Sequence, residues 1–172
     1  MLSTTIDFVK KFQKEHPFLG RVLDVGSLDI NGNIRGEFAE FDYLGVDMRK
    51  GPNVDIDING HDLKETFAKG EFDIVVCFDT LEHDDQFWLT VENMKWVLKK
   101  GGWLLVGAPS INHPRHNHPY DYYRFTRDSF LTYIFGDMTN VFVREDYYNV
   151  PENSDYNIDK PDQVFGWGQK CK

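Results

Sequence analysis

The side chains best suited to proton transfer gather in one stretch of the chain, residues 110–126. This stretch contains His113, His116 and His118, and imidazole is the side chain whose pKa lies closest to neutral pH. A loop of this length in a compact fold usually carries function. We therefore predict that the loop faces a substrate, with His116 or His118 as the general base.

The second half of the same loop adds two aromatic rings and two opposite charges. Tyr122 and Tyr123 could form an aromatic wall for a substrate, and Arg124 could bind an anionic group of it. Asp121 stands three residues before Arg124, so the alternative is structural: the two pair and pin the loop to the sheet. The sequence leaves both interpretations open.

A candidate metal-binding pattern precedes the loop. Asp79, Glu82 and His83 stand at i, i+3 and i+4, so one helical turn would gather them on one face, where they could hold a magnesium ion. We favour the alternative, in which Glu82 and His83 bond to backbone and neighbouring loops. The loop histidines lack the paired cysteines or recurrent spacing of structural zinc sites. We therefore expect no metal ion.

A nucleoside-binding pattern lies in the first half of the chain. Gly26 follows an apolar stretch and lets the backbone turn tightly against a ligand, because no Cβ intrudes. Asp47 ends a second apolar stretch, 23 residues after Asp24, where its carboxylate could accept hydrogen bonds from both ribose hydroxyls. The G-x-G-x-x-G spacing of a dinucleotide site is absent, which disfavours NAD.

Strands that could position these residues alternate with helices. The predicted strands are residues 21–25, 43–47, a short one within 54–58, 72–78, 103–108, 140–144 and 163–169. Helices are predicted from Ser3 or Thr4 to about His16, and over about residues 85–99, where two glycines follow. This alternation predicts an α/β fold with a Rossmann-like, doubly wound and mostly parallel sheet.

Length and composition set further limits. With 172 residues and no repeat or linker, we expect a single domain, residues 1–172. The net charge of −9 disfavours nucleic acid as the main partner, because phosphate binding needs a basic face. Two distant cysteines, no signal-peptide pattern and no apolar run of ~20 residues indicate a cytoplasmic protein without a membrane span.

Seven motifs in a fixed order resemble those of the small class I methyltransferases that depend on S-adenosylmethionine (SAM). They are VLDVGS (22–27), NG (31–32), YLGVD (43–47), FDIVV (72–76), LEH (81–83), LKKGG (98–102) and HPYDYYRF (118–125). The likeness is closest to a largely uncharacterised subgroup that is often associated with glycan or polysaccharide synthesis. The resemblance implies a sheet whose last strand is antiparallel, and SAM as the cofactor.

The resemblance also implies which residues contact SAM: Asp24, Gly26, Ser27, Asp47, Met48, Asn59, Gly60, His61 and Phe78. The first three would line the methionine end, Asp47 would hold the ribose and Met48 would pack on the adenine. Residues 59–61 would lie beside the adenine amino group, and Phe78 near the methyl-bearing sulfur. The family prefers further glycines in the first loop, whereas Leu28 and Ile30 stand here.

The implied activity is in-line transfer of the SAM methyl group to a small-molecule or glycan acceptor, with O-methylation favoured. Enzymes that methylate amino groups of DNA bases have two prolines and an aromatic residue after the fourth strand, and this chain has Asp79-Thr80-Leu81 there. Some quinone-pathway O-methyltransferases use two acids and a histidine at the spacing of residues 79, 82 and 83 to hold magnesium. The other function considered is a SAM-binding partner or regulatory module without activity of its own. The titratable loop favours the enzyme.

Overall fold

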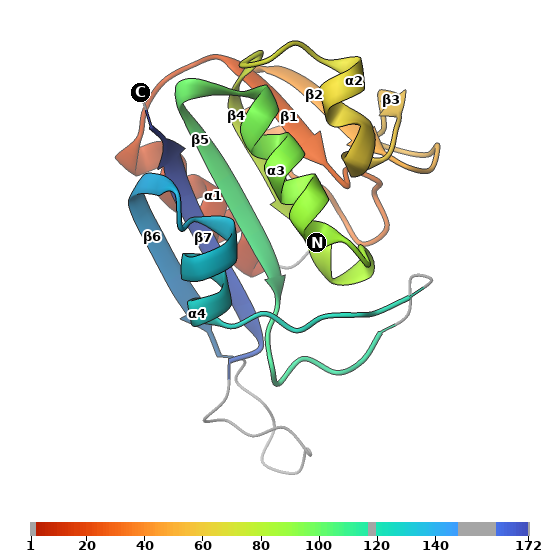
Figure 1. Ribbon diagram of the computed structural model, residues 1–172, viewed down its shortest axis with the longest axis vertical. Helices are drawn as coiled ribbons and strands as arrows, with labels where there is room; N and C mark the ends of the chain where they lie inside the picture. Colours follow the sequence, from red (N-terminus) through yellow and green to blue (C-terminus); the bar gives the residue numbers. More distant parts are fainter. Residues whose placement is uncertain (1–2, 117–119, 148–160, 172) are drawn as a thin grey trace.

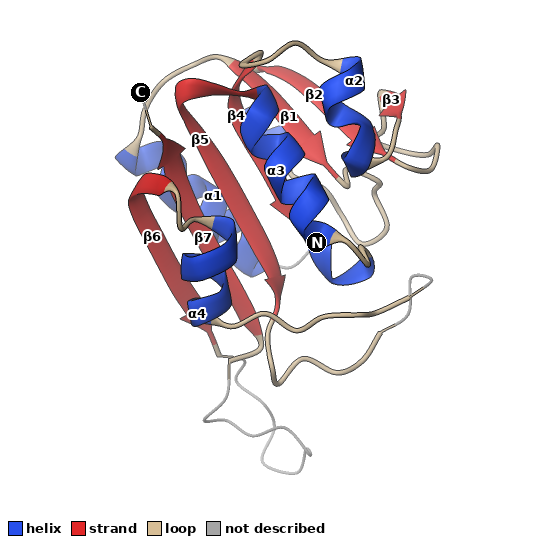
Figure 2. Cartoon of the chain, viewed as in Figure 1, coloured by secondary structure: helices blue, strands red, loops and turns tan. Residues whose placement is uncertain are grey.

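A seven-stranded sheet with the order β3-β2-β1-β4-β5-β7-β6 forms the centre of the molecule (Figures 1 and 2). The computed structural model describes residues 3–116, 120–147 and 161–171. The strands are β1 (Arg21–Val25), β2 (Asp42–Asp47), β3 (Ile56–Asp57), β4 (Phe72–Phe78), β5 (Leu98–Pro109), β6 (Met138–Asp146) and β7 (Gln163–Lys170). β7 runs antiparallel to both of its neighbours, β5 and β6, and the other neighbouring strands of the sheet are parallel. The prediction of a mostly parallel sheet with an antiparallel last strand is confirmed.

Helices cover both faces of the sheet (Figure 1). One face carries α1 (Ser3–Glu15), and the other carries α2 (Leu63–Thr66), α3 (Phe87–Val97) and α4 (Arg127–Ser129), which continues into the π-helical turn η4 (Phe130–Ile134). Short 3-10 turns are η1 (Arg35–Phe38), η2 (Gly60–Asp62) and η3 (Leu81–His83). Separate buried clusters fill the two faces, one around Phe8 and Phe12 of α1 and one around Val91 and Met94 of α3. Strands β1 and β4 are buried on both faces, which explains their uninterrupted apolar sequences.

The start of β5 corrects the sequence-based prediction. The predicted helix over 85–99 is shorter at both ends, and the predicted strand over 103–108 begins five residues earlier, at Leu98. The register with β4 shifts between Leu98 and Trp103, so the intervening residues form a bulge in which Gly101 has a φ of 79°. Lys99 pairs with Asp73 of β4 at 2.8 Å. The segment that looked like a helix end therefore contributes to the sheet.

A lysine distant in sequence donates hydrogen bonds to backbone carbonyl groups at the carboxyl end of α3. Lys170 Nζ donates hydrogen bonds to the carbonyls of Lys95 and Leu98, at 2.5 and 2.7 Å. Helix ends leave carbonyl groups without partners inside the helix, and a cation there also favours the helix dipole. Strand β7 thereby fixes the end of α3.

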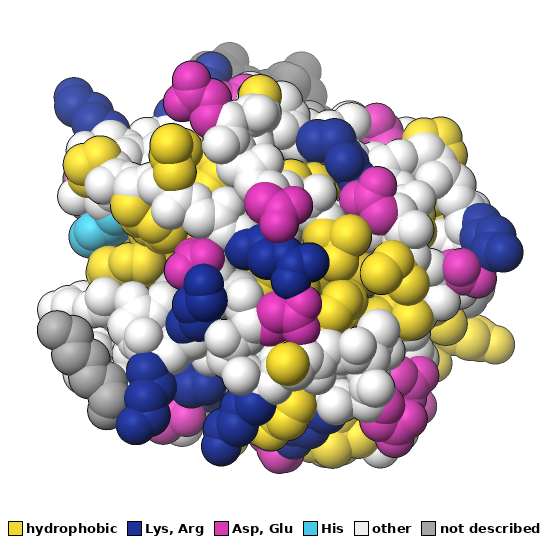
Figure 3. Space-filling model, turned by 90° about the horizontal axis from the view of Figure 1, so that it is seen from above, with side chains coloured by type: hydrophobic (Ala, Val, Ile, Leu, Met, Phe, Trp, Pro, Cys, Tyr) yellow, Lys and Arg dark blue, Asp and Glu magenta, His cyan; other side chains and the backbone are white. Residues whose placement is uncertain are grey.

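Charges of both signs are interspersed over the end of the molecule where the parallel strands begin (Figure 3). Arg21, the first residue of β1, pairs with Asp42 and with Glu71. This view shows no continuous basic surface, in agreement with the net charge of −9. Among the described residues, no helix combines the length and the apolar character needed to cross a bilayer.

Candidate functional site

Most of the predicted site residues lie at one edge of the sheet. Because β1 to β4 are parallel neighbours, the residues that follow them meet at their carboxyl ends, at the lower edge of the sheet in Figure 1. The loop that follows β5 passes across the same edge before it reaches α4. The fold thus brings the nucleoside-binding pattern and the histidine-containing loop to the same side.

The turn after β1 requires a glycine. Gly26 has a φ of 83°, and a Cβ there would lie 2.0 Å from Thr80 Oγ1. Its N–H and that of Ser27 both donate to the carbonyl of Val46, at 2.8 and 3.0 Å. The turn is therefore held against the end of β2 on one side and the loop after β4 on the other.

A polar network fixes this turn, and sequence reasoning missed its centre, Asn53. Ser27 Oγ donates to the Asn53 carbonyl at 3.1 Å, and Asn53 Nδ2 donates to the Ser27 carbonyl at 2.8 Å. Arg35 donates to Asn53 Oδ1 and to Asp55, both at 2.6 Å. Asn53 has a φ of 69°, a conformation that asparagine tolerates better than most residues. The asparagine directly after Gly51-Pro52 was the sequence signal that could have indicated a turn at this position.

Asp24 is 5 % exposed and accepts a hydrogen bond from the Tyr43 hydroxyl. Burial raises the pKa of Asp24 to about 7, against the opposing effects of Tyr43 and Arg35. Burial and the adjacent Asp24 carboxylate likewise raise the pKa of Tyr43. The Asp24 side chain is thus hydrogen bonded to β2, next to the turn at Gly26. The resemblance to methyltransferases predicted that Asp24 contacts SAM at this turn.

The end of β2 presents a polar and an apolar group. Asp47 Oδ1 accepts a hydrogen bond from the Arg49 N–H at 2.9 Å, and its side chain is 11 % exposed. The carbonyl of Asp47 accepts from the Ile58 N–H at 2.9 Å, which fixes the backbone. Met48 is 68 % exposed, so its side chain is available for an apolar ligand surface. This pair fits ribose and adenine contacts.

The segment after β3, residues 59–61, is anchored to α3 and to Asp84, which precedes that helix. Asn59 Oδ1 accepts from the His61 N–H at 3.0 Å, and Asn93 Nδ2 donates to the carbonyls of Gly60 and His61. His61 Nε2 lies 2.9 Å from Asp84 Oδ1. The side chains of Asn59 and His61 thus position the backbone of residues 59–61.

The end of β4 combines a core side chain with a strained one. The Phe78 ring is 5 % exposed and packs 6.2 Å from Phe8 and 6.3 Å from Phe165, so it faces the α1 side of the core. Asp79 follows with a φ of 48°, and its Oδ1 is buried without a hydrogen-bond partner among the described residues. Burial and then the charge of Glu82 raise the pKa of Asp79 to about 7.

Glu82, His83 and His116 converge beside this strand end. Glu82 Oε1 lies 3.5 Å from Nε2 of both histidines, and the Glu82 side chain is fully buried. The Glu82 carboxylate raises the pKa of His116, and partial burial opposes this. Sequence reasoning grouped Glu82 and His83 but could not place His116, 33 residues further on, beside them.

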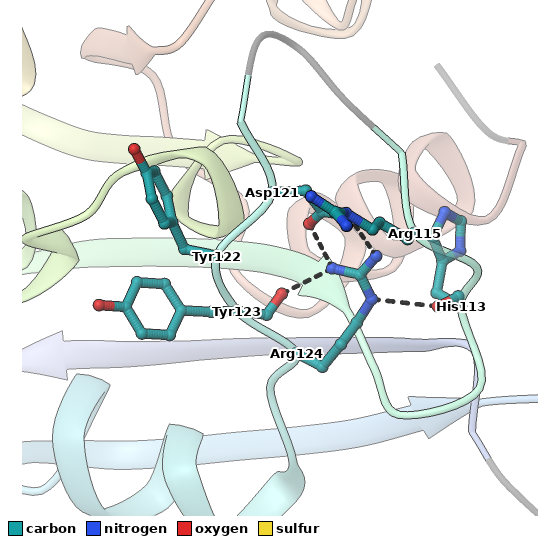
Figure 4. A pocket seen from close by; sticks show the side chains of 6 residues that line it. All are labelled: His113, Arg115, Asp121, Tyr122, Tyr123 and Arg124. Atoms are coloured by element: carbon teal, nitrogen blue, oxygen red, sulfur yellow. Dashed lines mark hydrogen bonds and ion pairs between the residues drawn. The ribbon is translucent and has the colours of Figure 1, made fainter.

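Asp121 and Arg124 form the centre of the loop (Figure 4). The Arg124 guanidinium donates to both Asp121 carboxylate oxygens and to the carbonyls of His113 and Pro114. The Asp121 side chain is 1 % exposed, and these hydrogen bonds hold its pKa well below the usual range. Asp121 and Arg124 thus pair, as the structural interpretation expected, and the bonds of Arg124 to His113 and Pro114 join the two halves of the loop.

Further hydrogen bonds fasten the loop to the rest of the molecule. The Phe125 N–H donates to the carbonyl of Pro109, the last residue of β5, at 2.9 Å, and the Tyr122 N–H donates to the Glu82 carbonyl at 2.7 Å. Tyr122 and Tyr123 help to line a shallow depression of about 300 Å³, with His113, Arg115, Asp121 and Arg124. Their rings point away from the Arg124 guanidinium (Figure 4). His118 lies outside the described residues.

Comparison with known proteins agrees with the fold. A family described as "Methyltransferase domain" matches residues 34–106. An Archaeoglobus fulgidus protein, described as a SAM-dependent methyltransferase, has a TM-score of 0.70 at 14% identity, covering 97% of this chain and 93% of its own. The family match covers less than half of the chain, and the structural likeness shows that the chain has the fold of a SAM-dependent methyltransferase.

Two relatives have named reactions. The chain is 26% identical to the ubiquinone biosynthesis O-methyltransferase of Paraburkholderia xenovorans (strain LB400), over 71% of this chain and 60% of that protein. A Burkholderia thailandensis 1,6-didemethyltoxoflavin-N1-methyltransferase, whose structure contains its substrate and S-adenosylhomocysteine, has a TM-score of 0.73 at 15% identity, covering 99% of this chain and 79% of its own. One of these relatives methylates oxygen and the other nitrogen, so the acceptor atom does not follow from the likeness.

Proposed function

We propose that this chain transfers the methyl group of SAM to a hydroxyl group of a small-molecule or glycan acceptor in the cytoplasm. The observation that carries the proposal is the shared edge of β1 to β4, where the turn at Gly26, the acid Asp47 and the Glu82–His116 pair all lie. When bound, SAM supplies an activated methyl group, so the protein's tasks are alignment, exclusion of water and removal of the acceptor proton.

The cofactor is assigned to the turn after β1 and the ends of β2 and β3. Gly26 closes the turn so tightly that a Cβ would overlap Thr80, which leaves the backbone as the surface that a ligand meets. Asp47 would accept hydrogen bonds from the ribose, and exposed Met48 would cover the adenine. The backbone of residues 59–61, held by Asn93, would border the adenine amino group.

The proton acceptor is assigned to His116. Its imidazole is 37 % exposed and stands beside the buried Glu82, whose negative charge strengthens it as a base. His118 remains the second candidate from the sequence. Asp121 and Arg124 are assigned a positioning role, because Asp121 accepts a hydrogen bond from the His116 N–H and Arg124 holds Asp121 in place.

Turnover with a panel of acceptors tests the proposal. The purified chain would be incubated with SAM and catechols, other phenols, sugar nucleotides and amines, and the formation of S-adenosylhomocysteine would be measured. We expect turnover with at least one hydroxyl acceptor. Turnover with amines alone would contradict O-methylation. Tight SAM binding without turnover on any acceptor would favour a regulatory module.

A further inference from the structure

We propose that Glu82, His83 and His116 bind one divalent transition-metal ion of the zinc class. One oxygen or nitrogen atom from each of these side chains lies within 4.8 Å of the other two. The ligands come from η3 and from the loop after β5, so the ion would join the two elements that border the candidate acceptor side. This inference deepens the proposed function, and it concerns the same edge of the sheet.

The strongest evidence is the state of the Glu82 carboxylate. The Glu82 side chain is fully buried, and neither of its oxygens has a hydrogen-bond partner among the described residues. A buried carboxylate without hydrogen bonds is costly, so such groups are paired or coordinate metals. The two neighbouring imidazole nitrogens are too far away, at 3.5 Å, to be good hydrogen-bond donors to it. A cation between the three groups would compensate the charge.

The spacing suits a metal ion. Zinc binds nitrogen and oxygen ligands at about 2.0–2.1 Å in a tetrahedral arrangement, which separates neighbouring ligand atoms by about 3.3 Å. The two separations from Glu82 Oε1, 3.5 Å each, are close to this value. Three protein ligands leave the fourth position of a tetrahedral ion for water or a substrate.

Outer contacts orient the ligands. His83 Nδ1 is hydrogen bonded to the Tyr120 carbonyl; a carbonyl oxygen only accepts, so Nδ1 carries the proton. The neutral ring then presents the lone pair of Nε2 towards Glu82, as in metal sites where a second hydrogen bond fixes the tautomer. Asp121 Oδ2 lies 3.8 Å from His116 Nδ1 and accepts from the His116 N–H at 2.7 Å.

The donor set selects the kind of ion. Two imidazoles and one carboxylate suit zinc and its neighbours, whereas magnesium prefers oxygen ligands. From the sequence we expected no metal ion, and the alternative was magnesium at Asp79, Glu82 and His83. The proposed ligands differ from the sequence-based alternative because the loop places His116 beside Glu82. The spacing of the two residues in the sequence gave no sign of this contact.

The ion changes the role of His116. A nitrogen that binds a metal cannot accept a proton, so the base assignment above applies to the metal-free protein. In the metal-bound protein, an acceptor hydroxyl at the open position would have a lower pKa and would release its proton to water. Because protons compete for the imidazoles, zinc affinity falls as the pH is lowered.

Titration calorimetry of the full chain, stripped of metal by a chelator, tests the inference. We expect one zinc ion per chain, binding at least 100-fold more tightly than magnesium, and a higher melting temperature with zinc. His83→Ala and His116→Ala should each weaken zinc binding at least tenfold. Glu82→Gln should abolish it and also raise the melting temperature of the metal-free protein, because it removes the uncompensated charge.

Matched controls separate this site from others. His16→Ala removes a histidine from the opposite face of the sheet, where it packs on Trp103, and Cys171→Ser removes the exposed thiol. Both should bind zinc as the wild type does. Failure to bind one equivalent of zinc, or zinc binding as tight as that of the wild type by the His83→Ala and His116→Ala variants, would overturn the inference. Methyl transfer by zinc-free protein would leave the proposed function intact, whereas zinc binding without methyl transfer to any acceptor would count against that function alone.

Discussion

The Tyr43 hydroxyl, on β2, donates a hydrogen bond to the buried carboxylate of Asp24, on the neighbouring strand β1. The contact lies two residues before the turn at Gly26, in the strand that leads to the candidate cofactor site. Burial raises the pKa of Asp24 to about 7, so a group inside the sheet titrates near physiological pH. This relationship makes the stability of the fold depend on pH.

Asp24→Asn should flatten the pH dependence of stability. Between about pH 4 and pH 7, the unfolded chain loses the Asp24 proton whereas the folded chain keeps it, so the free energy of unfolding falls as the pH rises. The loss from this group is on the order of 2–4 kcal/mol. Urea unfolding at pH 4.5, 6 and 7.5 measures it. Asp79, also with a pKa of about 7, stays in both proteins, so only the difference between them reports on Asp24. Parallel curves for the two proteins would contradict the assignment.

Gly26→Ala should destabilise the fold and weaken SAM binding. The positive φ costs on the order of 1–2 kcal/mol for alanine, and the new Cβ would overlap Thr80 Oγ1. Adding Thr80→Ala should relieve part of the overlap, because it removes Oγ1 and Cγ2 but leaves the Cβ of residue 80 at 2.8 Å, and the cost of the positive φ remains. Thermal melting of the single and double variants measures both parts. A single variant as stable as the wild type would rule out the described turn.

Asp47→Ala should weaken SAM binding at least tenfold while the fold survives. The change removes hydrogen bonds from a charged acceptor to the ribose, each worth roughly 1.5–3 kcal/mol. Asp42→Ala is the matched control, since it removes an acid from the other end of the same strand, where Asp42 is 72 % exposed. Calorimetry with SAM should separate the two variants. Equal affinities would remove Asp47 from the ribose site.

In the metal-free protein, His116→Ala should lower kcat for a hydroxyl acceptor by roughly 10²–10⁴, the usual contribution of a positioned general base. SAM affinity should stay nearly unchanged, because His116 lies on the loop after β5 rather than at the ends of β1 to β3. His118→Ala tests the second candidate in the same assay. Steady-state kinetics with paired SAM titrations give both values. Full turnover by both variants would show that the loop does not supply the base.

Arg124→Ala should lower the melting temperature by several degrees. It leaves the Asp121 carboxylate, 1 % exposed, without its counter-charge, and breaking a buried pair costs about 3–5 kcal/mol, less here because Arg124 is 20 % exposed. Arg115→Ala, on the same loop, is the control. The Asp121→Asn/Arg124→Ala double variant should lose less than the sum of the single changes. Additive losses would mean that the two side chains act independently.

The fold could be predicted from sequence because its signals are local. Continuous apolar runs such as Phe72–Phe78 occur where a strand is buried on both faces, and the structure has β4 at the same residues. The predicted boundary between α3 and β5 was wrong because the sequence of residues 99–102 is compatible with two local structures, a helix end and a bulged strand. Their pairing with β4 decided between these patterns, and sequence periodicity carries no information on pairing.

The candidate site was predictable only in part, for a related reason. Gly26 and Asp47 are found at strand ends by their type and spacing, and the structure has both there. Asn53 and Glu82 depend on contacts with residues that are distant in sequence, such as Arg35 and His116. Asp79 gave no signal of its left-handed conformation, because glycine is the residue that usually marks one.

The placement of β7 between β5 and β6 has a consequence for synthesis on the ribosome. β7 follows all the other strands in the sequence, yet it occupies an interior position and pairs along its length with both neighbours. Until residues 163–170 have left the exit tunnel, β6 has no partner and β5 has an open edge. The nascent chain must therefore hold an incomplete sheet, and exposed strand edges of this kind are where chains pair wrongly or recruit chaperones.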